Sequence, residues 1–76
     1  MNRQRRATLE SAKGLLKQAA DLIEQVRDQE SDAMDNIPEN LQGSERYEKM
    51  ENAVDKLDSA LEDIESAQES IDEAVS

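Results

Sequence analysis

Hydrophobic residues recur three and four positions apart along two stretches of the chain, residues 3–35 and 44–75, the spacing of one face of an α-helix. Between them, residues 36–43 hold Pro38, which disfavours helical geometry at the preceding residue, and Ser44 follows as a good helix N-cap. A connection this short makes the two helices antiparallel neighbours. The pattern predicts an all-α fold, a single coiled-coil-like antiparallel hairpin over residues 1–76.

Heptad positions a and d describe the expected contact face. In the first stretch they are Leu9, Ala12, Leu16, Ala19, Ile23, Val26, Glu30 and Ala33, and Ile37 continues the row into the connection. In the second they are Arg46, Met50, Ala53, Leu57, Ala60, Ile64, Ala67, Ile71 and Ala74. Because four successive d positions from residue 53 are alanine, the pattern predicts close approach of the two backbones along this row. Ile37 and Leu41 are expected to close the loop end.

Further apolar residues lie beside this face. They are Leu15 and Leu22 at g in the first stretch, and Val54, Leu61 and Val75 at e in the second. This is more apolar surface than one partner helix covers. A chain of 76 residues without cysteine or histidine has no disulfide or zinc site to compensate. We therefore expect a homo-oligomeric helical bundle, a dimer or tetramer, with Leu15, Leu22, Val54 and Leu61 at the subunit interface.

Charged residues interrupt the apolar pattern at the loop end. Glu30 occupies an a position and Arg46 a d position, and an antiparallel hairpin is expected to bring them within about one turn of each other, with Tyr47 adjacent. One interpretation is an ion pair that fixes the helix register. The other is a polar pocket in which Arg46 holds an anionic group and Tyr47 stacks on a planar ring.

Arginines gather at the other end of the chain, where Arg3, Arg5 and Arg6 begin the first helix. Their charge opposes the helix dipole, as do the acids that end the second helix. These ends lie side by side in a hairpin, so Arg6 could pair with Asp72 or Glu73. Alternatively, the guanidinium groups and the free helix N–H groups form an anion site.

The two charged clusters lie too far apart to cooperate within one hairpin. An antiparallel dimer would place the arginine-rich end of one subunit beside Arg46 and Tyr47 of the other. Composite sites built from both chains would then occur in symmetric pairs.

Composition excludes most catalytic chemistry. Without histidine, cysteine or a glycine-rich phosphate loop there is no nucleophile and base to name, so we expect no enzyme, no catalytic residue, no metal and no cofactor. The formal net charge of −10 is uneven, being +3 through Arg27, −5 from Asp28 to Gly43 and −8 from Ser44 onward. An acidic second half argues against nucleic-acid binding. No apolar run approaches a membrane span, so we expect a soluble, cytoplasmic protein.

The segment Asn36-Ile-Pro-Glu-Asn-Leu-Gln-Gly-Ser-Glu-Arg-Tyr47, with the arginines near the start and Met50, Ala53, Leu57 and Ala60 after it, resembles a family of short acidic helical proteins of phages and mobile elements of Gram-positive bacteria. Small phage accessory proteins of this kind are often anti-defence factors, and some sequester nucleotide immune signals. The resemblance implies that Arg5, Arg6, Arg46 and Tyr47 hold phosphates and a base.

Three functions remain open on this basis. The first is non-enzymatic sequestration of a small anionic nucleotide at subunit interfaces, in phage counter-defence within the host cytoplasm. The second is an acidic protein-interaction module that inhibits a host protein, for example by mimicking the charge of DNA. The third is a structural or assembly role as a coiled coil.

Overall fold

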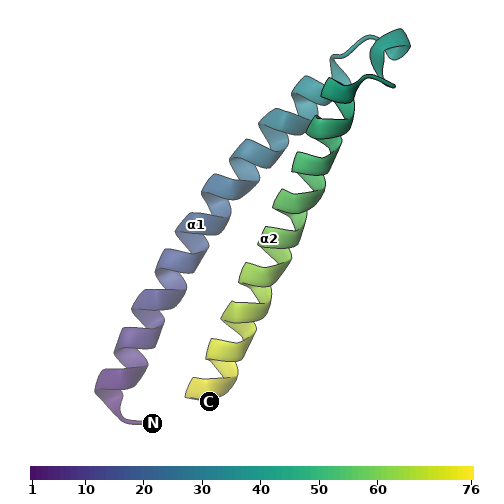
Figure 1. The fold of residues 1–76 in the computed structure, drawn as a ribbon. Helices are drawn as coiled ribbons and strands as arrows, with labels where there is room; N and C mark the ends of the chain where they lie inside the picture. The colour runs from purple at the N-terminus through teal and green to yellow at the C-terminus, as the bar shows by residue number, and fades with distance from the viewer.

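The computed structural model describes all residues 1–76 as two long helices joined by a short loop. Helix α1 spans Arg3–Asp35, a 3₁₀ turn η1 spans Glu39–Leu41, and helix α2 spans Glu45–Val75. The helices run antiparallel, with both termini at the end opposite the loop (Figure 1). The result is a rod of 59 × 15 × 13 Å. The predicted all-α fold with two helices packed against each other is confirmed.

Both helices begin at side chains that cap free backbone N–H groups. The Asn2 side-chain oxygen accepts a hydrogen bond from the Arg5 backbone N–H at 2.8 Å, and the Ser44 hydroxyl accepts one from the Tyr47 N–H at 3.2 Å. Glu45 and Glu48 occupy the first turn of α2, where negative charge complements the helix dipole. Helix α1 ends at Asp35, shortly before Pro38. In the loop, the Leu41 N–H donates to the Pro38 carbonyl at 2.8 Å.

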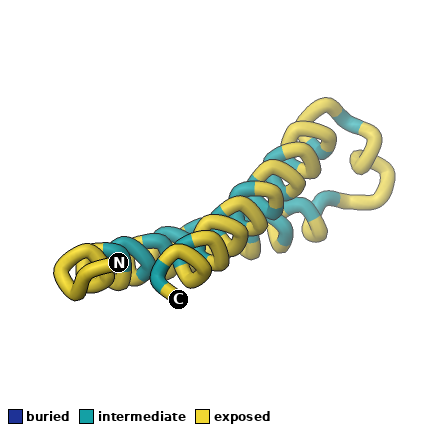
Figure 2. The backbone as a smooth tube through the Cα atoms, turned by 90° about the horizontal axis from the view of Figure 1, so that it is seen from below, coloured by how far each residue is buried: buried dark blue, intermediate teal, exposed yellow.

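Half-buried residues recur along the facing sides of the helices (Figure 2). Because each helix has only the other as a neighbour, these rows mark the seam between them. On α1 the main row is Leu9, Lys13, Leu16, Ala20, Ile23, Arg27, Glu30 and Met34, continued by Ile37. On α2 it is Tyr47, Met50, Val54, Leu57, Leu61, Ile64, Gln68, Ile71 and Val75. The seam therefore uses positions a and e, with the alanine d row at its edge.

This seam corrects the predicted division between contact face and free face. Val54 and Leu61 are half-buried on the side of α2 that faces α1, whereas Ala67 and Ala74 are exposed. The reason is that valine and leucine bury more apolar surface in the seam than alanine would. Ala60 is half-buried at the edge of the seam. At the loop end Ile37 is half-buried, but Leu41 is 50% exposed and does not close the hairpin as expected.

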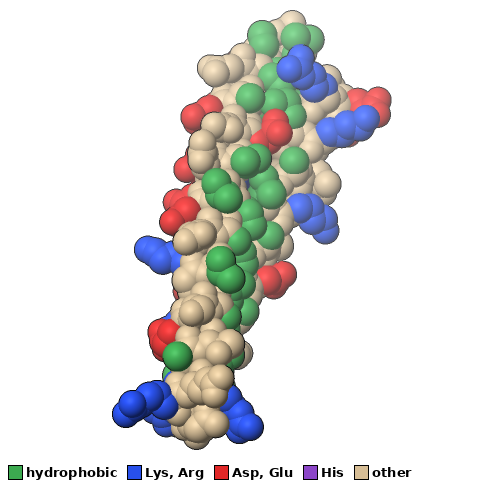
Figure 3. Space-filling view, turned by 90° about the vertical axis from the view of Figure 1, so that its left-hand side faces the viewer, with side chains coloured by type: hydrophobic (Ala, Val, Ile, Leu, Met, Phe, Trp, Pro, Cys, Tyr) green, Lys and Arg blue, Asp and Glu red, His purple; other side chains and the backbone are tan.

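The d rows of both helices project to the same side of the hairpin, because the helices are antiparallel and share the a/e seam. Together with the g row of α1 they form the apolar stripe, defined as Ala12, Leu15, Ala19, Leu22, Val26 and Ala33 on α1 and Ala53, Ala60, Ala67 and Ala74 on α2. Hydrophobic side chains run along most of the length of the molecule in Figure 3. Leu15 is 66% exposed, Leu22 64% and Val26 51%.

No residue of the hairpin is fully buried. Two helices form a single layer, so every side chain in the seam keeps one edge open to solvent. Neither helix combines the length and the apolar character needed to cross a lipid bilayer.

Candidate functional site

Arg46 stands in the first turn of α2 with an exposed, unpaired side chain. No carboxylate oxygen lies within 4.0 Å of its guanidinium group. It borders an open groove of about 450 Å³, whose walls are Glu30, Glu45, Arg46, Lys49, Met50 and Ala53. It also borders a second depression at the loop, beside Pro38 and Leu41. The guanidinium group is therefore accessible from two sides.

The predicted ion pair between Glu30 and Arg46 does not form, although both residues line the same groove. The reason lies in the register of the hairpin. Cross-helix ion pairs join residue 13 to residue 72 and residue 27 to residue 58, which places residue 30 at the level of residue 55. Arg46 lies nine residues before residue 55, on the loop side of α2, which is roughly 13 Å along the helix axis at 1.5 Å per residue. Met50 and Ala53 fill the interval.

Tyr47 was expected beside Arg46 as a stacking surface, but it lies at a different position on the helix surface. Its side chain is half-buried in the row that faces α1, and it lines none of the three depressions of the molecule. An e position faces the seam, whereas the d position of Arg46 faces the edge. The structure therefore separates Tyr47 from the Arg46 groove.

The N-terminal arginines are also free of acids. Arg5 borders an open depression of about 520 Å³ with Met1, Asn2, Gln4, Thr8 and Leu9. Arg6 donates from Nε to the Met1 carbonyl at 3.1 Å and lines no depression. Neither these two nor Arg3 has a carboxylate within 4.0 Å. The expected pairing of Arg6 with Asp72 or Glu73 does not form.

Asp72 is instead paired with Lys13, about two helical turns beyond Arg6 along α1. The hydrogen bond from Lys13 to Asp72, with the nearby charges of Asp72 and Glu10, raises the pKa of Lys13 against a smaller opposing effect of burial. This pair holds α1 to the C-terminal part of α2. It also leaves the arginines at the tip of α1 without the acid partner that the pattern suggested.

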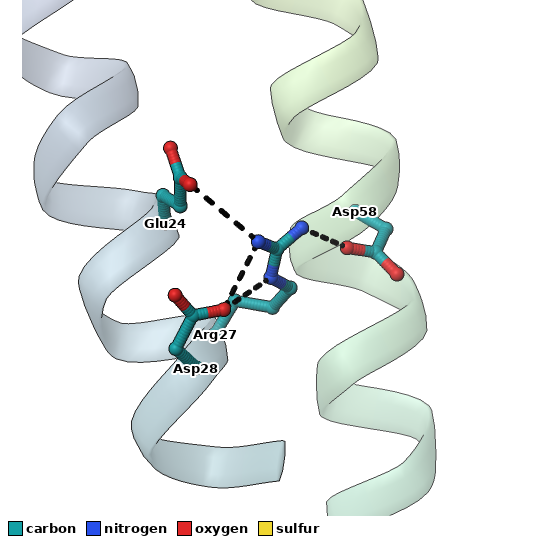
Figure 4. Close-up of polar contacts among 4 residues, drawn as sticks. All are labelled: Glu24, Arg27, Asp28 and Asp58. Carbon is teal, nitrogen blue, oxygen red and sulfur yellow. Dashed lines mark hydrogen bonds and ion pairs between the residues drawn. The ribbon is translucent and has the colours of Figure 1, made fainter.

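Arg27, like Lys13, is a charged residue of the seam whose cross-helix pairing the sequence interpretation missed (Figure 4). It reaches from α1 to Asp58 of α2, with Nη1 at 2.9 Å from the carboxylate, and contacts Asp28 at 3.0 Å and Glu24 at 3.8 Å. Hydrogen bonds to Asp58 and Asp28 raise the pKa of Arg27. The available signal was spacing: Lys13 and Arg27 are two heptads apart, and so are their partners Asp58 and Asp72.

Arg5 and Arg46 both occupy d positions, so each lies on the face that carries the apolar stripe. The groove at Arg46 and the depression at Arg5 open toward this same face, at its two ends. In Figure 3, basic side chains stand at both ends of the molecule. Along the rod, the two arginines are roughly 50 Å apart at 1.5 Å per residue. One chain therefore presents two half-sites on one face and cannot join them.

No group of three or more carboxylates is placed to hold a metal ion. The chain matches no protein-family model, no curated protein sequence and no solved structure.

Proposed function

We propose that the protein is a non-enzymatic hairpin that binds and sequesters a small anionic nucleotide at sites shared by two subunits. The observation that supports this most is the isolation of its arginines. The chain has a formal net charge of −10, yet Arg5 and Arg46 have no acid partner, and each borders an open depression. Uncompensated guanidinium groups amid such an excess of carboxylates suit an anionic ligand.

The chemistry of these groups fits phosphate. A guanidinium group binds phosphate oxygens through two parallel hydrogen bonds, which gives both affinity and orientation. The depressions, at about 450 and 520 Å³, fall within the range of small-molecule sites. Glu30 supplies an acceptor in the Arg46 groove, and a carboxylate there favours a ligand with amine or hydroxyl groups over a simple anion. The anion contacts are assigned to Arg5, Arg6 and Arg46 and do not depend on Tyr47.

Sequestration requires only binding, without making or breaking covalent bonds. This agrees with a chain that has no histidine and no cysteine. The resemblance to small phage proteins supplies the biological setting, counter-defence against a nucleotide immune signal in the cytoplasm of the host. A binder of this kind acts by stoichiometry, so its effect would scale with the number of sites rather than with a turnover rate.

Calorimetric titration of the purified protein with a panel of cyclic and linear nucleotides tests this function. We expect Arg46→Ala to lose binding, and the Arg5→Ala/Arg6→Ala double variant to lose it in parallel. Lys17→Ala and Lys56→Ala are the matched controls, because these exposed lysines are also unpaired but line no depression. Retained binding by both arginine variants, or equal losses in the lysine variants, would contradict the proposal.

Mixing the two arginine variants provides a sharper test of the shared site. A mixed dimer has one composite site that retains Arg5, Arg6 and Arg46, so partial recovery of binding is expected after subunit exchange. Because Arg46 has no ion-pair partner, Arg46→Ala should change the free energy of unfolding by less than about 0.5 kcal/mol. Loss of several kcal/mol would instead indicate the structural ion pair with Glu30.

A second candidate function, inhibition of a host protein by an acidic surface, is supported by the C-terminal half of α2. Of the acids in this segment, only Asp72 is in an ion pair. The full set is Glu62, Asp63, Glu65, Glu69, Asp72 and Glu73. A rod with this much free carboxylate could compete with DNA for a basic protein surface. Replacing Glu62, Glu65 and Glu69 with glutamine should abolish such competition, while nucleotide binding by the arginine sites should persist.

A further inference from the structure

The apolar stripe is the largest feature of the molecule that the hairpin itself leaves uncovered. Leu15, Leu22 and Val26 each expose more than half of their surface, and the alanine row of α2 extends the same face. The chain exposes 5764 Å² in total. A folded monomer of this mass exposes about 4,650 Å², so the hairpin carries roughly 1,100 Å² in excess. A standard protein interface buries about 800 Å² on each partner.

We propose that the stripe binds the stripe of a second copy of this chain, in a two-fold antiparallel dimer. This dimer rests on the proposed function in one respect, because it is the assembly that the shared sites require. Its formation does not depend on a ligand. Because the two-fold axis is perpendicular to the rod, α1 of one copy lies over α1 of the other. When the rods overlap fully, the axis passes between Ala19 and Leu22. Leu15 of each copy then packs near Val26 of the other copy.

Charge favours the antiparallel orientation over the parallel one. Along α1 the net charge is +4 through Gln18 and −5 from Ala19 to Asp35. An antiparallel pair lays the basic half of α1 over the acidic half of its counterpart. Counted over the whole chain, the loop half of the hairpin, residues 19–59, carries −8 and the half with the termini carries −2. A parallel pair would stack the two −8 halves at a separation near the screening length of about 8 Å.

The same orientation joins the half-sites. With the axis between Ala19 and Leu22, Arg5 of one copy lies at the level of the last residues of α1 in the other. Arg46 begins α2 at that same end, on the same face. The depression at Arg5 and the groove at Arg46 therefore meet twice in the dimer, once at each end. Either one alone is an open half-site.

Single cysteines test the surface and its orientation without any nucleotide, because the chain has no other thiol. Under mild oxidation Leu22→Cys, near the axis, should cross-link to itself, whereas Leu15→Cys should not, since its two copies lie roughly 16 Å apart along the rod. A mixture of Leu15→Cys with Val26→Cys should cross-link. Ser59→Cys, on the outer side of α2, is the control and should remain monomeric on a denaturing gel.

Sedimentation of the unmodified chain measures the mass of the assembly without any substitution that could alter folding. We expect a species of twice the 8.5 kDa chain mass at tens of micromolar. A monomer at that concentration would overturn the proposal, and equal self-cross-linking of Leu15→Cys and Leu22→Cys would overturn the antiparallel orientation. Cross-links in the expected pattern together with failure to bind any nucleotide would uphold the dimer and refute the proposed ligand function alone.

Discussion

Replacing Leu22 by aspartate should dissociate the dimer while leaving the hairpin seam in place. Leu22 lies on the g row of α1, is 64% exposed in the single chain and has no role in the a/e seam. The substitution therefore removes apolar surface only from the stripe. It also places a carboxylate on the apolar stripe close to the two-fold axis, where the second copy would bring another carboxylate at close range.

The magnitude follows from the exposed fraction of the side chain. Full burial of a leucine is worth about 1.5–3 kcal/mol, so covering the exposed two thirds of Leu22 contributes about 1–2 kcal/mol in each subunit. A two-fold dimer contains the residue twice, which makes the loss about 2–4 kcal/mol before the added charge. At 1.4 kcal/mol per factor of ten, the dimer dissociation constant should rise at least about 30-fold.

Sedimentation velocity over a range of concentrations measures this constant directly. Leu41→Asp is the matched control, because Leu41 is 50% exposed but lies in the loop, away from the stripe. It should dissociate the dimer much less than Leu22→Asp does. Equal effects of the two variants would show that leucine exposure in general, rather than the stripe, drives association. An unchanged constant for Leu22→Asp would refute the assignment of the interface.

Two further predictions concern the hairpin itself. Ala60→Leu should lower the free energy of unfolding by about 1–3 kcal/mol in urea denaturation, because Ala60 is half-buried at the edge of the seam. Ala7→Leu, on the outer face, is the neutral control. An unchanged free energy of unfolding for Ala60→Leu would place that residue outside any close contact. The raised pKa of Lys13 means that its pair with Asp72 stabilises the fold fully below the ordinary lysine pKa of about 10.4, and that this contribution is lost as the pH rises through the raised value. Melting temperatures from about pH 9 to 12 should therefore fall more steeply for the unmodified chain than for Lys13→Met, and parallel curves would contradict the pairing.

The helices could be predicted from the sequence because they depend on local signals. Spacing, the Ser44 cap and Pro38 all act within a few residues of the positions they control, and the structure agrees with each. The seam could not be fixed in the same way. Apolar residues occupy four heptad rows, so periodicity allowed either a/d or a/e as the contact. The decision depends on which pairing buries the larger side chains, with Val54 and Leu61 outweighing the alanines.

The candidate site was predicted only in part, because its geometry also depends on contacts between distant parts of the chain. The sequence shows Arg46 as a break in the apolar pattern, but the position of Arg46 relative to Glu30 depends on an axial register that short-range patterns do not encode. That register is marked by the pairs of Arg27 with Asp58 and of Lys13 with Asp72, which join distant parts of the chain. Arg27 escaped notice because a charged residue at e is ordinary on a solvated helix face. It becomes a seam residue only when e faces the partner helix.

The two edges of the seam differ, and this difference determines what the hairpin can assemble into. Arg27 and Lys13, at e, reach acids at b of α2, so both cross-helix ion pairs lie along the edge opposite the apolar stripe. A second copy docking on the ion-paired edge would have to desolvate those charges, which is unfavourable without new partners. A copy docking on the stripe covers mainly leucine, valine and alanine. Because only one edge is suited to association, and a two-fold pair uses that edge completely, the hairpin should form closed dimers rather than open-ended stacks.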